Sequence, residues 1–250
     1  MTRSTLLATT EARFGAKLIE KILPGAVASV EAFDDPPEAV LYPVEAEVIS
    51  RAVDKRCREF RTVRHCARQA LHQLGLPPAP VLPGKRGEPQ WPPGVVGSMT
   101  HCGGYRAAAL ALSRDLHTLG IDAEPHQPLP AGVLAVIALD EERDNLSELA
   151  AADGATCWDR ILFCAKETVY KAWFPLTRSW LGFADAAVTI NPGTTDPAEG
   201  TFTARLLVTA PTSTGETLTR LEGRWLRGDE LVITTIALSA AGVVDQLLPS

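Results

Sequence analysis

The sequence predicts an α+β protein, because each half of the chain combines helical segments with runs that alternate like antiparallel strands. Two observations support this fold class. Residues 44–74 carry apolar side chains at three- and four-residue steps, which is the spacing of one helix face. From residue 180 onward, alternating apolar and polar residues form four runs separated by polar turns. The 250 residues are enough for one large domain or two smaller ones.

The first elements are predicted from short apolar runs and from turn residues. Residues 1–43 mix such runs with the turn-rich DDPPE and predict strand and loop. Residues 44–74 predict a helix, and Gly75 ends it, with Pro77 and Pro78 directly beyond. The apolar face of its second half consists of Phe60, Val63, Ala67, Ala70, Leu71 and Leu74.

A loop and three strands are predicted next. Residues 76–94 are rich in proline and glycine and predict a loop. Residues 95–101 and 105–113 predict strands, although the alanine content of the second would also allow a helix on propensity alone. Residues 117–124 predict a strand that ends in acidic residues.

The second half of the chain is predicted to begin with helices and to end with strands. The helices cover about 131–150 and 157–174. The expected strands lie within 180–190, 201–210, 216–226 and 230–240.

Composition excludes some classes of protein. The formal net charge of −6 disfavours a nucleic-acid binder held by bulk electrostatics. No run approaches the ~20 apolar residues of a membrane span, and the first fifteen residues lack the apolar core of a signal peptide. We therefore expect a cytoplasmic protein. Its scattered cysteines, without a CxxC pair, read as reduced thiols: Cys57, Cys66, Cys102, Cys157 and Cys164.

A basic segment interrupts this acidic chain. Residues 51–68 contain seven basic residues against two acidic ones, and Lys85 and Arg86 follow in the proline-rich loop. Arginine forks match phosphate oxygens, so the cluster favours a phosphate-bearing ligand. The alternative is a solvated helix face with local ion pairs. The basic residues of the segment are Arg51, Lys55, Arg56, Arg58, Arg61, Arg64 and Arg68.

Two carboxylates follow the apolar run at 117–121. Asp122 and Glu124 are two residues apart, so on a strand both point to the same side. They would repel each other and raise each other's pKa unless a cation lies between them. Carboxylate oxygens suit Mg²⁺, which completes its shell with water and substrate phosphates. An acidic pair of this kind also occurs in exposed turns, so it is weak evidence alone.

Three charged residues lie inside the apolar segment 162–174. Glu167 and Lys171 share one helix face in the favourable order, and Lys166 adjoins them. The alternative reading is a surface ion pair worth about 0.3–0.5 kcal/mol. The apolar neighbours favour instead one wall of a site. Tyr170 and Trp173 are expected to belong to the core.

These motifs together resemble the 4′-phosphopantetheinyl transferases. One family signature, glycine-hydrophobic-Asp-x-Glu at a strand end, reads GIDAE at 120–124, and the other, a helix with W/F-(S/C)-x-K-E-x-x-x-K, reads FCAKETVYK at 163–171. The resemblance covers nearly the whole chain. It is greatest to the branch with the enterobactin-synthase transferase component and the actinobacterial transferases.

The resemblance implies a fold and a set of site residues. The fold would consist of two similar halves, 1–122 and 123–250, related by a pseudo-twofold axis with the active site in the cleft between them. Mg²⁺, or Mn²⁺ as an alternative ion, would be held against the pyrophosphate of coenzyme A by Asp122, the Ala123 carbonyl, Glu124 and Glu167. The coenzyme would be contacted by Arg56, Arg64, Gly84, Lys85, Arg86, Thr100, His101, Asp122, Lys166, Glu167, Lys171 and Leu181, with Gly182 beside the pantetheine arm.

Particular parts of the coenzyme are implied for particular residues. Lys166 and Lys171 would neutralise the pyrophosphate, and Thr100 and His101 would contact phosphates. Arg56 and Arg64 would reach the 3′-phosphate and adenine end, and residues 84–86 would close over the nucleotide. This chain has Gly-Glu-Pro at 87–89, where many relatives have Gly-Lys-Pro. The basic contact there must come from Lys85 or Arg86, and the sequence leaves this choice open.

The implied reaction transfers phosphopantetheine from coenzyme A to a serine of an apo acyl or peptidyl carrier protein, releasing adenosine 3′,5′-bisphosphate. The catalytic residues would be Glu167, Lys171 and Asp122, with Glu167 as the base directly or through a water on the metal. The branch implies a monomer that serves polyketide, nonribosomal peptide or siderophore synthesis, without nucleic acid or membrane as a partner. Two alternatives stay open: a non-catalytic phosphate- or nucleic-acid-binding module, and another Mg²⁺-dependent nucleotide hydrolase.

Overall fold

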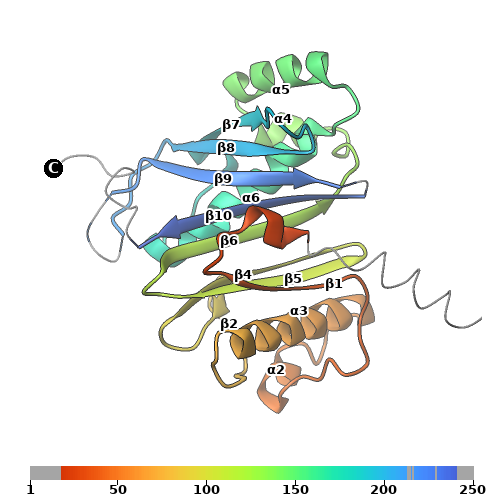
Figure 1. Ribbon diagram of the computed structural model, residues 1–250, viewed down its shortest axis with the longest axis vertical. Helices are drawn as coiled ribbons and strands as arrows, with labels where there is room; N and C mark the ends of the chain where they lie inside the picture. Colours follow the sequence, from red (N-terminus) through yellow and green to blue (C-terminus); the bar gives the residue numbers. More distant parts are fainter. Residues whose placement is uncertain (1–17, 213–214, 216, 229, 241–250) are drawn as a thin grey trace, which may run out of the picture.

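Two antiparallel sheets lie side by side in the computed structural model, and a long helix packs against each (Figure 1). The structure describes residues 18–212, 215, 217–228 and 230–240. The expectation that the chain does not begin with a signal peptide concerns residues within 1–17, which lie outside these residues. The mixed helices and antiparallel sheets confirm the predicted α+β class.

The smaller sheet has the strand order β1-β5-β4, and the larger has the order β6-β10-β9-β8-β7. The strands of the smaller sheet are β1 (Ala28–Ala32), β4 (Val95–Cys102) and β5 (Tyr105–Leu112). Those of the larger sheet are β6 (Leu116–Pro125), β7 (Ala186–Pro192), β8 (Glu199–Leu206), β9 (Arg220–Arg227) and β10 (Leu231–Ser239). Each run that the sequence predicted to be extended between 95 and 240 overlaps one of these strands, but the segments 180–185, 207–210 and 217–219 lie outside them. Residue 216 lies outside the described residues.

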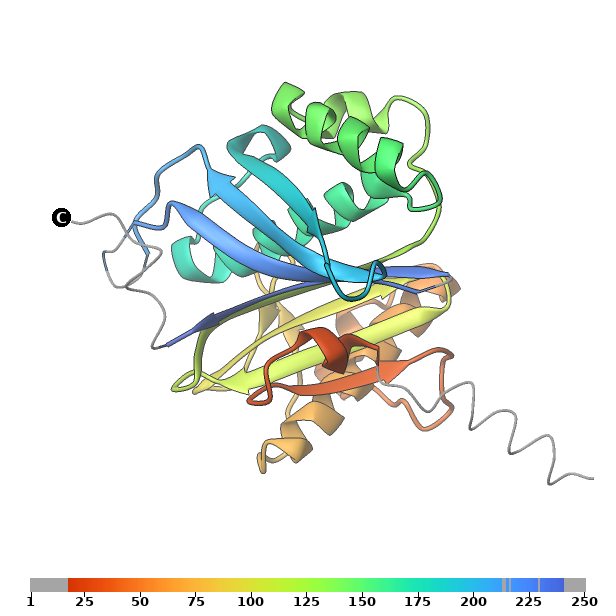
Figure 2. The ribbon, with the colours of Figure 1, turned by 45° about the horizontal axis from the view of Figure 1, so that its top comes forward.

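Helices cover the sheets and fill the connections. The long helices are α3 (Asp54–Gln73), which packs on β1 and β5, and α6 (Trp158–Thr177), which packs on β6 and β10. Figure 2 shows α5 beside β7, at the edge of the larger sheet that is remote from the smaller one. The shorter helices are η1 (Ile19–Ile22), α2 (Pro43–Val48), α4 (Val133–Ile137), α5 (Asp140–Ala152) and η2 (Phe183–Asp185).

The alanine-rich run forms the central strand of the smaller sheet rather than a helix. Tyr105, Ala107 and Ala109 belong to a core shared with β6 and β10, while Ala108 and Leu110 pack towards α3. All five are fully buried. Small side chains suit a strand that is covered on both faces, so tertiary packing overrides the helix propensity of alanine.

Two predicted helices are each divided in two, which corrects the sequence analysis. The segment 44–74 forms α2 and α3 with a turn between them, because the buried carboxylate of Glu45 accepts hydrogen bonds from Arg68 and from the Val81 amide. These contacts require α2 to fold back against α3. The segment 131–150 is divided at Ala138, where the backbone is extended, and the Glu142 carboxylate accepts from the Leu139 amide at 2.7 Å to begin α5.

The two sheets are joined through hydroxyl groups. Along β4, the Oγ of Ser98 accepts a hydrogen bond from the Ile121 amide and the Oγ1 of Thr100 accepts one from the Ala123 amide, each at 3.1 Å. The donors and acceptors recur at every second residue, as the pleat of a strand requires. The predicted division at 122/123 falls within β6, and the two-subdomain organisation stays a prediction. Among the described residues, none of the helices combines the length and apolar character needed to span a membrane.

Candidate functional site

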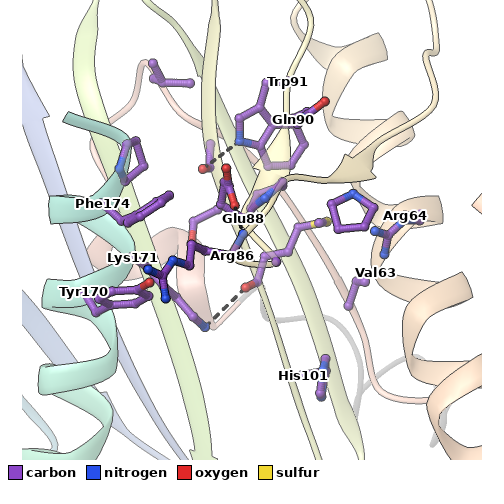
Figure 3. A pocket seen from close by; sticks show the side chains of 18 of the residues that line it. Val63, Arg64, Arg86, Glu88, Gln90, Trp91, His101, Tyr170, Lys171 and Phe174 are labelled. Carbon is purple, nitrogen blue, oxygen red and sulfur yellow. Dashed lines mark hydrogen bonds between the residues drawn. The ribbon is translucent and has the colours of Figure 1, made fainter. Parts of the chain in front are cut away.

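A cavity of about 930 Å³ lies between the two long helices (Figure 3). Its walls come from α3, β4, α6, the end of α2 and the segment 83–91. The same segment contains a minimal hairpin of β2 (Leu82–Pro83) and β3 (Pro89–Gln90). In Figure 3, Tyr170, Lys171 and Phe174 project from α6, opposite Val63 and Arg64 on α3.

Gly120 brings α6 close to the acidic end of β6. A Cβ at this position would lie 2.5 Å from the Thr168 carbonyl oxygen and 3.0 Å from the Ala172 nitrogen. On the same side of β6, the Thr118 hydroxyl donates to the Ala172 carbonyl at 2.8 Å. The glycine of the GIDAE motif therefore permits a helix-to-strand approach that any side chain would obstruct.

Asp122 and Lys171 meet at this contact between helix and strand. The Lys171 Nζ lies 2.7 Å from Asp122 Oδ1 and also donates to the carbonyls of Ile121 and Met99. The Thr100 hydroxyl donates to the same Oδ1 at 3.0 Å while accepting from the Ala123 amide. Asp122 is only 5% exposed, so this network fixes a nearly buried carboxylate beside the cavity.

The two other predicted acidic ligands lie near Asp122 but have different partners. Glu124 Oε2 accepts from Arg160 Nη1 at 2.9 Å. Burial, followed by the charge of Asp122, raises the pKa of Glu124, and Arg160 opposes this effect. Glu167 lines the cavity, and its pKa is also raised, first by burial and then by Asp122, while Lys171 lowers it.

The acidic residues fit a divalent cation in chemistry, although they do not form a closed ligand set. Asp122 Oδ2 is buried and has no hydrogen-bond partner in the described part of the chain. A buried carboxylate oxygen without a partner is costly unless a cation or a donor reaches it. Within that same part, no three His, Cys, Asp or Glu side chains are grouped closely enough to hold an ion alone. Lys171 and Arg160 instead engage Asp122 Oδ1 and Glu124 Oε2, so the predicted metal set stays a prediction.

A second polar group lines the α3 side of the cavity. Arg56 Nη1 lies 2.6 Å from His101 Nε2, and Glu59 Oε2 lies 3.6 Å from the other ring nitrogen of His101. Burial is the largest influence on His101 and lowers its pKa, which Glu59 partly offsets. A histidine ring with a neighbouring arginine can form hydrogen bonds to a phosphate ester or a base at this end of the cavity.

Arg64 is placed at the cavity wall but is largely committed to the fold. Its Nε donates to the Val81 carbonyl at 2.8 Å, and its guanidinium lies over the Phe60 ring, 3.1 Å from the ring centroid. Burial lowers the pKa of Arg64 to about 10. The residue therefore contributes positive charge to the cavity from a fixed position.

The hairpin segment supplies Arg86, whereas Lys85 is absent from the cavity wall. Arg86, Gly87 and Glu88 line the cavity, and Lys85 is exposed. The Gly84 amide donates to the Glu88 carbonyl at 2.7 Å, which closes the turn. The sequence left open whether Lys85 or Arg86 makes the basic contact, and the position of Arg86 on the cavity wall favours Arg86.

The residues that line the cavity do not include the predicted Gly84, Lys85, Thr100, Asp122, Ala123, Glu124, Lys166, Leu181 and Gly182. Of these, Lys166 and Leu181 are buried with other partners. Lys166 is 4% exposed. Its side chain points away from that of Glu167, and from Asp122, because successive side chains on a helix are rotated by about 100°. Its Nζ pairs with Glu142, so its predicted position beside the pyrophosphate is corrected. Leu181 is buried in the core under α6 and is not part of the wall either.

Tyr170 corrects the sequence analysis in the opposite direction. It lines the cavity and its ring packs on Trp180, with centroids 5.2 Å apart, whereas Trp173 is fully buried as predicted. Three further polar residues near the cavity were not predicted from the sequence: Ser98, Glu59 and Arg160. Ser98 could have been found from its two-residue spacing to Thr100 on a strand, whereas the partners of Glu59 and Arg160 are set by tertiary contacts.

Known proteins resemble the chain over nearly its whole length. A family model described as the 4′-phosphopantetheinyl transferase N-terminal domain matches residues 44–111, and one described as the 4′-phosphopantetheinyl transferase superfamily matches residues 118–219. The 4′-phosphopantetheinyl transferase Svp of Streptomyces mobaraensis is 52% identical across 92% of this chain and 93% of its own length. For the 4′-phosphopantetheinyl transferase PptT of Mycobacterium tuberculosis the identity is 51%, across 88% and 98%. The 4′-phosphopantetheinyl transferase Npt of Nocardia iowensis is 49% identical, across 88% and 99%.

Proposed function

The chain belongs to the 4′-phosphopantetheinyl transferase superfamily, and we propose that the cavity between α3 and α6 is where it carries out this reaction. The enzyme moves phosphopantetheine from coenzyme A to a carrier protein. We further propose that the acceptor is a serine hydroxyl, that adenosine 3′,5′-bisphosphate is released, and that the carriers serve polyketide, nonribosomal peptide or siderophore synthesis.

One observation carries the assignment of the site. Glu167 and Lys171 from α6 line the cavity, and Asp122 from β6 contacts Lys171 directly behind its wall, although the two elements are separated by more than thirty residues of chain. Two carboxylates beside a lysine suit a diphosphate that is bound with a cation, because opposite charges must alternate around its oxygens. This arrangement supports phosphoryl transfer over simple nucleotide binding.

The divalent ion is proposed to be Mg²⁺, with Mn²⁺ as a substitute. Asp122 and Glu167 would hold it, with the Ala123 carbonyl and Glu124 as further oxygen donors. When bound, such an ion offsets negative charge on the diphosphate and on the leaving group. The unpartnered Oδ2 of Asp122 supports this role.

Three side chains of the protein would have separate roles in the transfer. Glu167 would accept the proton of the serine hydroxyl, because it lines the cavity beside Lys171. Lys171 would neutralise charge on the transferred phosphate, and Thr100 would hold Asp122 in place.

The nucleotide would lie towards α3. Arg56 and His101 would contact its phosphates, with Arg64 behind them and Arg86 closing from the hairpin. A single chain supplies all of these groups, which supports action as a monomer.

The test is to incubate the protein with coenzyme A, Mg²⁺ and several apo carrier proteins, and to weigh the carriers by mass spectrometry. A gain of one phosphopantetheine group, abolished by chelation of the metal, supports the proposal. Consumption of coenzyme A with unmodified carriers would instead support a hydrolase, and salt-dependent binding of oligonucleotides without either reaction would support a binding module.

A further inference from the structure

The ammonium group of Lys166 has three partners, and none of them lines the cavity. Its Nζ donates to the Phe183 carbonyl at 2.6 Å and to the Ala186 carbonyl at 2.9 Å, and it lies 2.8 Å from Glu142 Oε1. These contacts use all three donors of the ammonium group. Burial lowers its pKa, and the hydrogen bond and charge of Glu142 oppose that effect.

Both carboxylate oxygens of Glu142 also accept hydrogen bonds from backbone amides. Its Oε1 also accepts from the Val188 amide at 2.7 Å, and its Oε2 accepts from the Leu139 amide at the start of α5. Glu142 is 1% exposed. The pair Lys166–Glu142 therefore ties α6, the start of α5, η2 and β7 together at one buried point.

The chain held by Lys166 borders the cavity. Arg178 lines it, and Trp180 packs on Tyr170, which also lines it. Two more contacts bind this segment to the helix: Trp173 Nε1 donates to the Ser179 carbonyl at 3.1 Å, and the Phe183 ring packs against Phe163. Trp180 itself is 64% exposed, so its position depends on the anchored chain around it rather than on burial.

We propose that Lys166 is a positioning residue for the transfer: with Glu142, it holds the segment 179–186 against α6 and so fixes Trp180 against Tyr170, which lines the cavity. We call this pair the Tyr170–Trp180 wall. The substrate part that this wall would border is the pantetheine arm, which is long and largely apolar compared with the nucleotide. This inference rests on the proposed function, but the anchoring itself does not. It assigns the charge of Lys166 to the shape of the site rather than to the phosphates.

The first test is limited trypsin digestion of Lys166→Met, which keeps the length of the stem and removes the charge. Cleavage after Arg178, identified by mass, should become ~10-fold faster, because proteolysis follows the population of the locally opened segment. Thr168→Val is the matched control. It removes a buried contact of the same helix, the 2.6 Å hydrogen bond to Thr234, without touching the segment. This control should leave the rate after Arg178 unchanged.

The second test is steady-state kinetics with coenzyme A and an apo carrier. Lys166→Met should raise KM for coenzyme A ~10-fold with kcat within ~3-fold, as expected for loss of binding that is equal in ground and transition states. Trp180→Ala should raise KM similarly, and the double variant should add little, since both changes remove the same wall. If Lys166→Met does not fold, Glu142→Gln takes its place in both tests.

The outcomes separate the anchoring role from a phosphate contact and from failure of the proposed function. Unchanged cleavage after Arg178, or a fall in kcat of ~100-fold at constant KM, would overturn the inference. Either result would favour a direct contact between Lys166 and the phosphates of coenzyme A. Additive effects on KM in the double variant would also contradict it. If the parent protein transfers nothing, the digestion still decides whether Lys166 anchors the segment.

Discussion

Lys171 Nζ lies 2.7 Å from Asp122 Oδ1, so a helix and a strand that are distant in sequence share one ion pair at the edge of the cavity. The pair exists because Gly120 permits α6 to approach β6. It puts a cation and a nearly buried carboxylate side by side, and the second carboxylate oxygen is left without a hydrogen-bond partner in the part of the chain described here.

Asp122→Asn tests this carboxylate with little change in shape. We expect kcat/KM to fall at least ~100-fold, because an amide can neither balance Lys171 nor bind a cation as strongly. The measurement is the rate of carrier modification by mass spectrometry at saturating Mg²⁺. Asp115→Asn, in the turn before β6, is the control and should retain normal turnover. An Asp122→Asn enzyme with near-normal turnover would remove Asp122 from the site.

Gly120→Ala tests the approach of the helix. The added Cβ would meet the Thr168 carbonyl oxygen at 2.5 Å, and backbone cannot move aside as a flexible side chain can. We expect the free energy of unfolding to fall by about 1–3 kcal/mol, as in overpacked cores, together with a loss of transferase activity. Urea unfolding provides the measurement. Gly25→Ala is the control, since nothing lies within 4 Å of its added Cβ.

The sequence is sufficient to predict the parts of this site that depend on local pattern. The strand ending in Asp122 and Glu124 and the helix carrying Glu167 and Lys171 both follow from periodicity, and the structure brings Asp122, Glu167 and Lys171 together. The resemblance to a known family adds the expectation of a cleft between two halves. A cavity lies between α3 and α6, and the division of the chain into two similar halves stays a prediction.

Features that depend on tertiary partners could not be predicted. The break between α2 and α3 is set by Glu45, whose partners Arg68 and Val81 lie 23 and 36 residues away. Lys166 looked like a site residue because it adjoins Glu167, yet its partner Glu142 comes from another helix. Nothing in the local spacing of charges indicates which carbonyls or carboxylates will surround a buried ammonium group.

Arg86→Ala and Lys85→Ala form a matched pair on the hairpin. We expect Arg86→Ala to raise KM for coenzyme A by ~10-fold, because it removes a charged contact to phosphate. Lys85→Ala should leave KM nearly unchanged, since Lys85 is exposed outside the cavity wall. Initial rates across a range of coenzyme A concentrations decide between them. Equal effects of the two substitutions would show that the hairpin contributes only general positive charge.

Glu31→Gln tests a buried carboxyl far from the reaction. Burial raises the pKa of Glu31 above its ordinary 4.5, although Tyr105 and the Ile19 amide donate to its Oε1. The unfolded chain then releases the proton at lower pH than the folded protein. The parent's free energy of unfolding should therefore fall, relative to that of Glu31→Gln, as pH rises from 4.5 towards the raised pKa.

Urea unfolding of the parent and Glu31→Gln at a series of pH values measures this difference. The amide retains an oxygen that can accept from Tyr105, so the substitution removes the titration with little loss of packing. A difference in unfolding free energy that stays constant from pH 4 to 8, where carboxyl groups of this kind titrate, would show that the folded-state pKa of Glu31 is not raised.

The most direct test of the account is a crystal structure of the protein with coenzyme A and Mn²⁺, with the metal located by its anomalous scattering. The account predicts one ion bound by Asp122 and Glu167, with the diphosphate on its open side and Lys171 against a phosphate oxygen. An ion bound elsewhere, or a diphosphate held away from these two carboxylates, would contradict it.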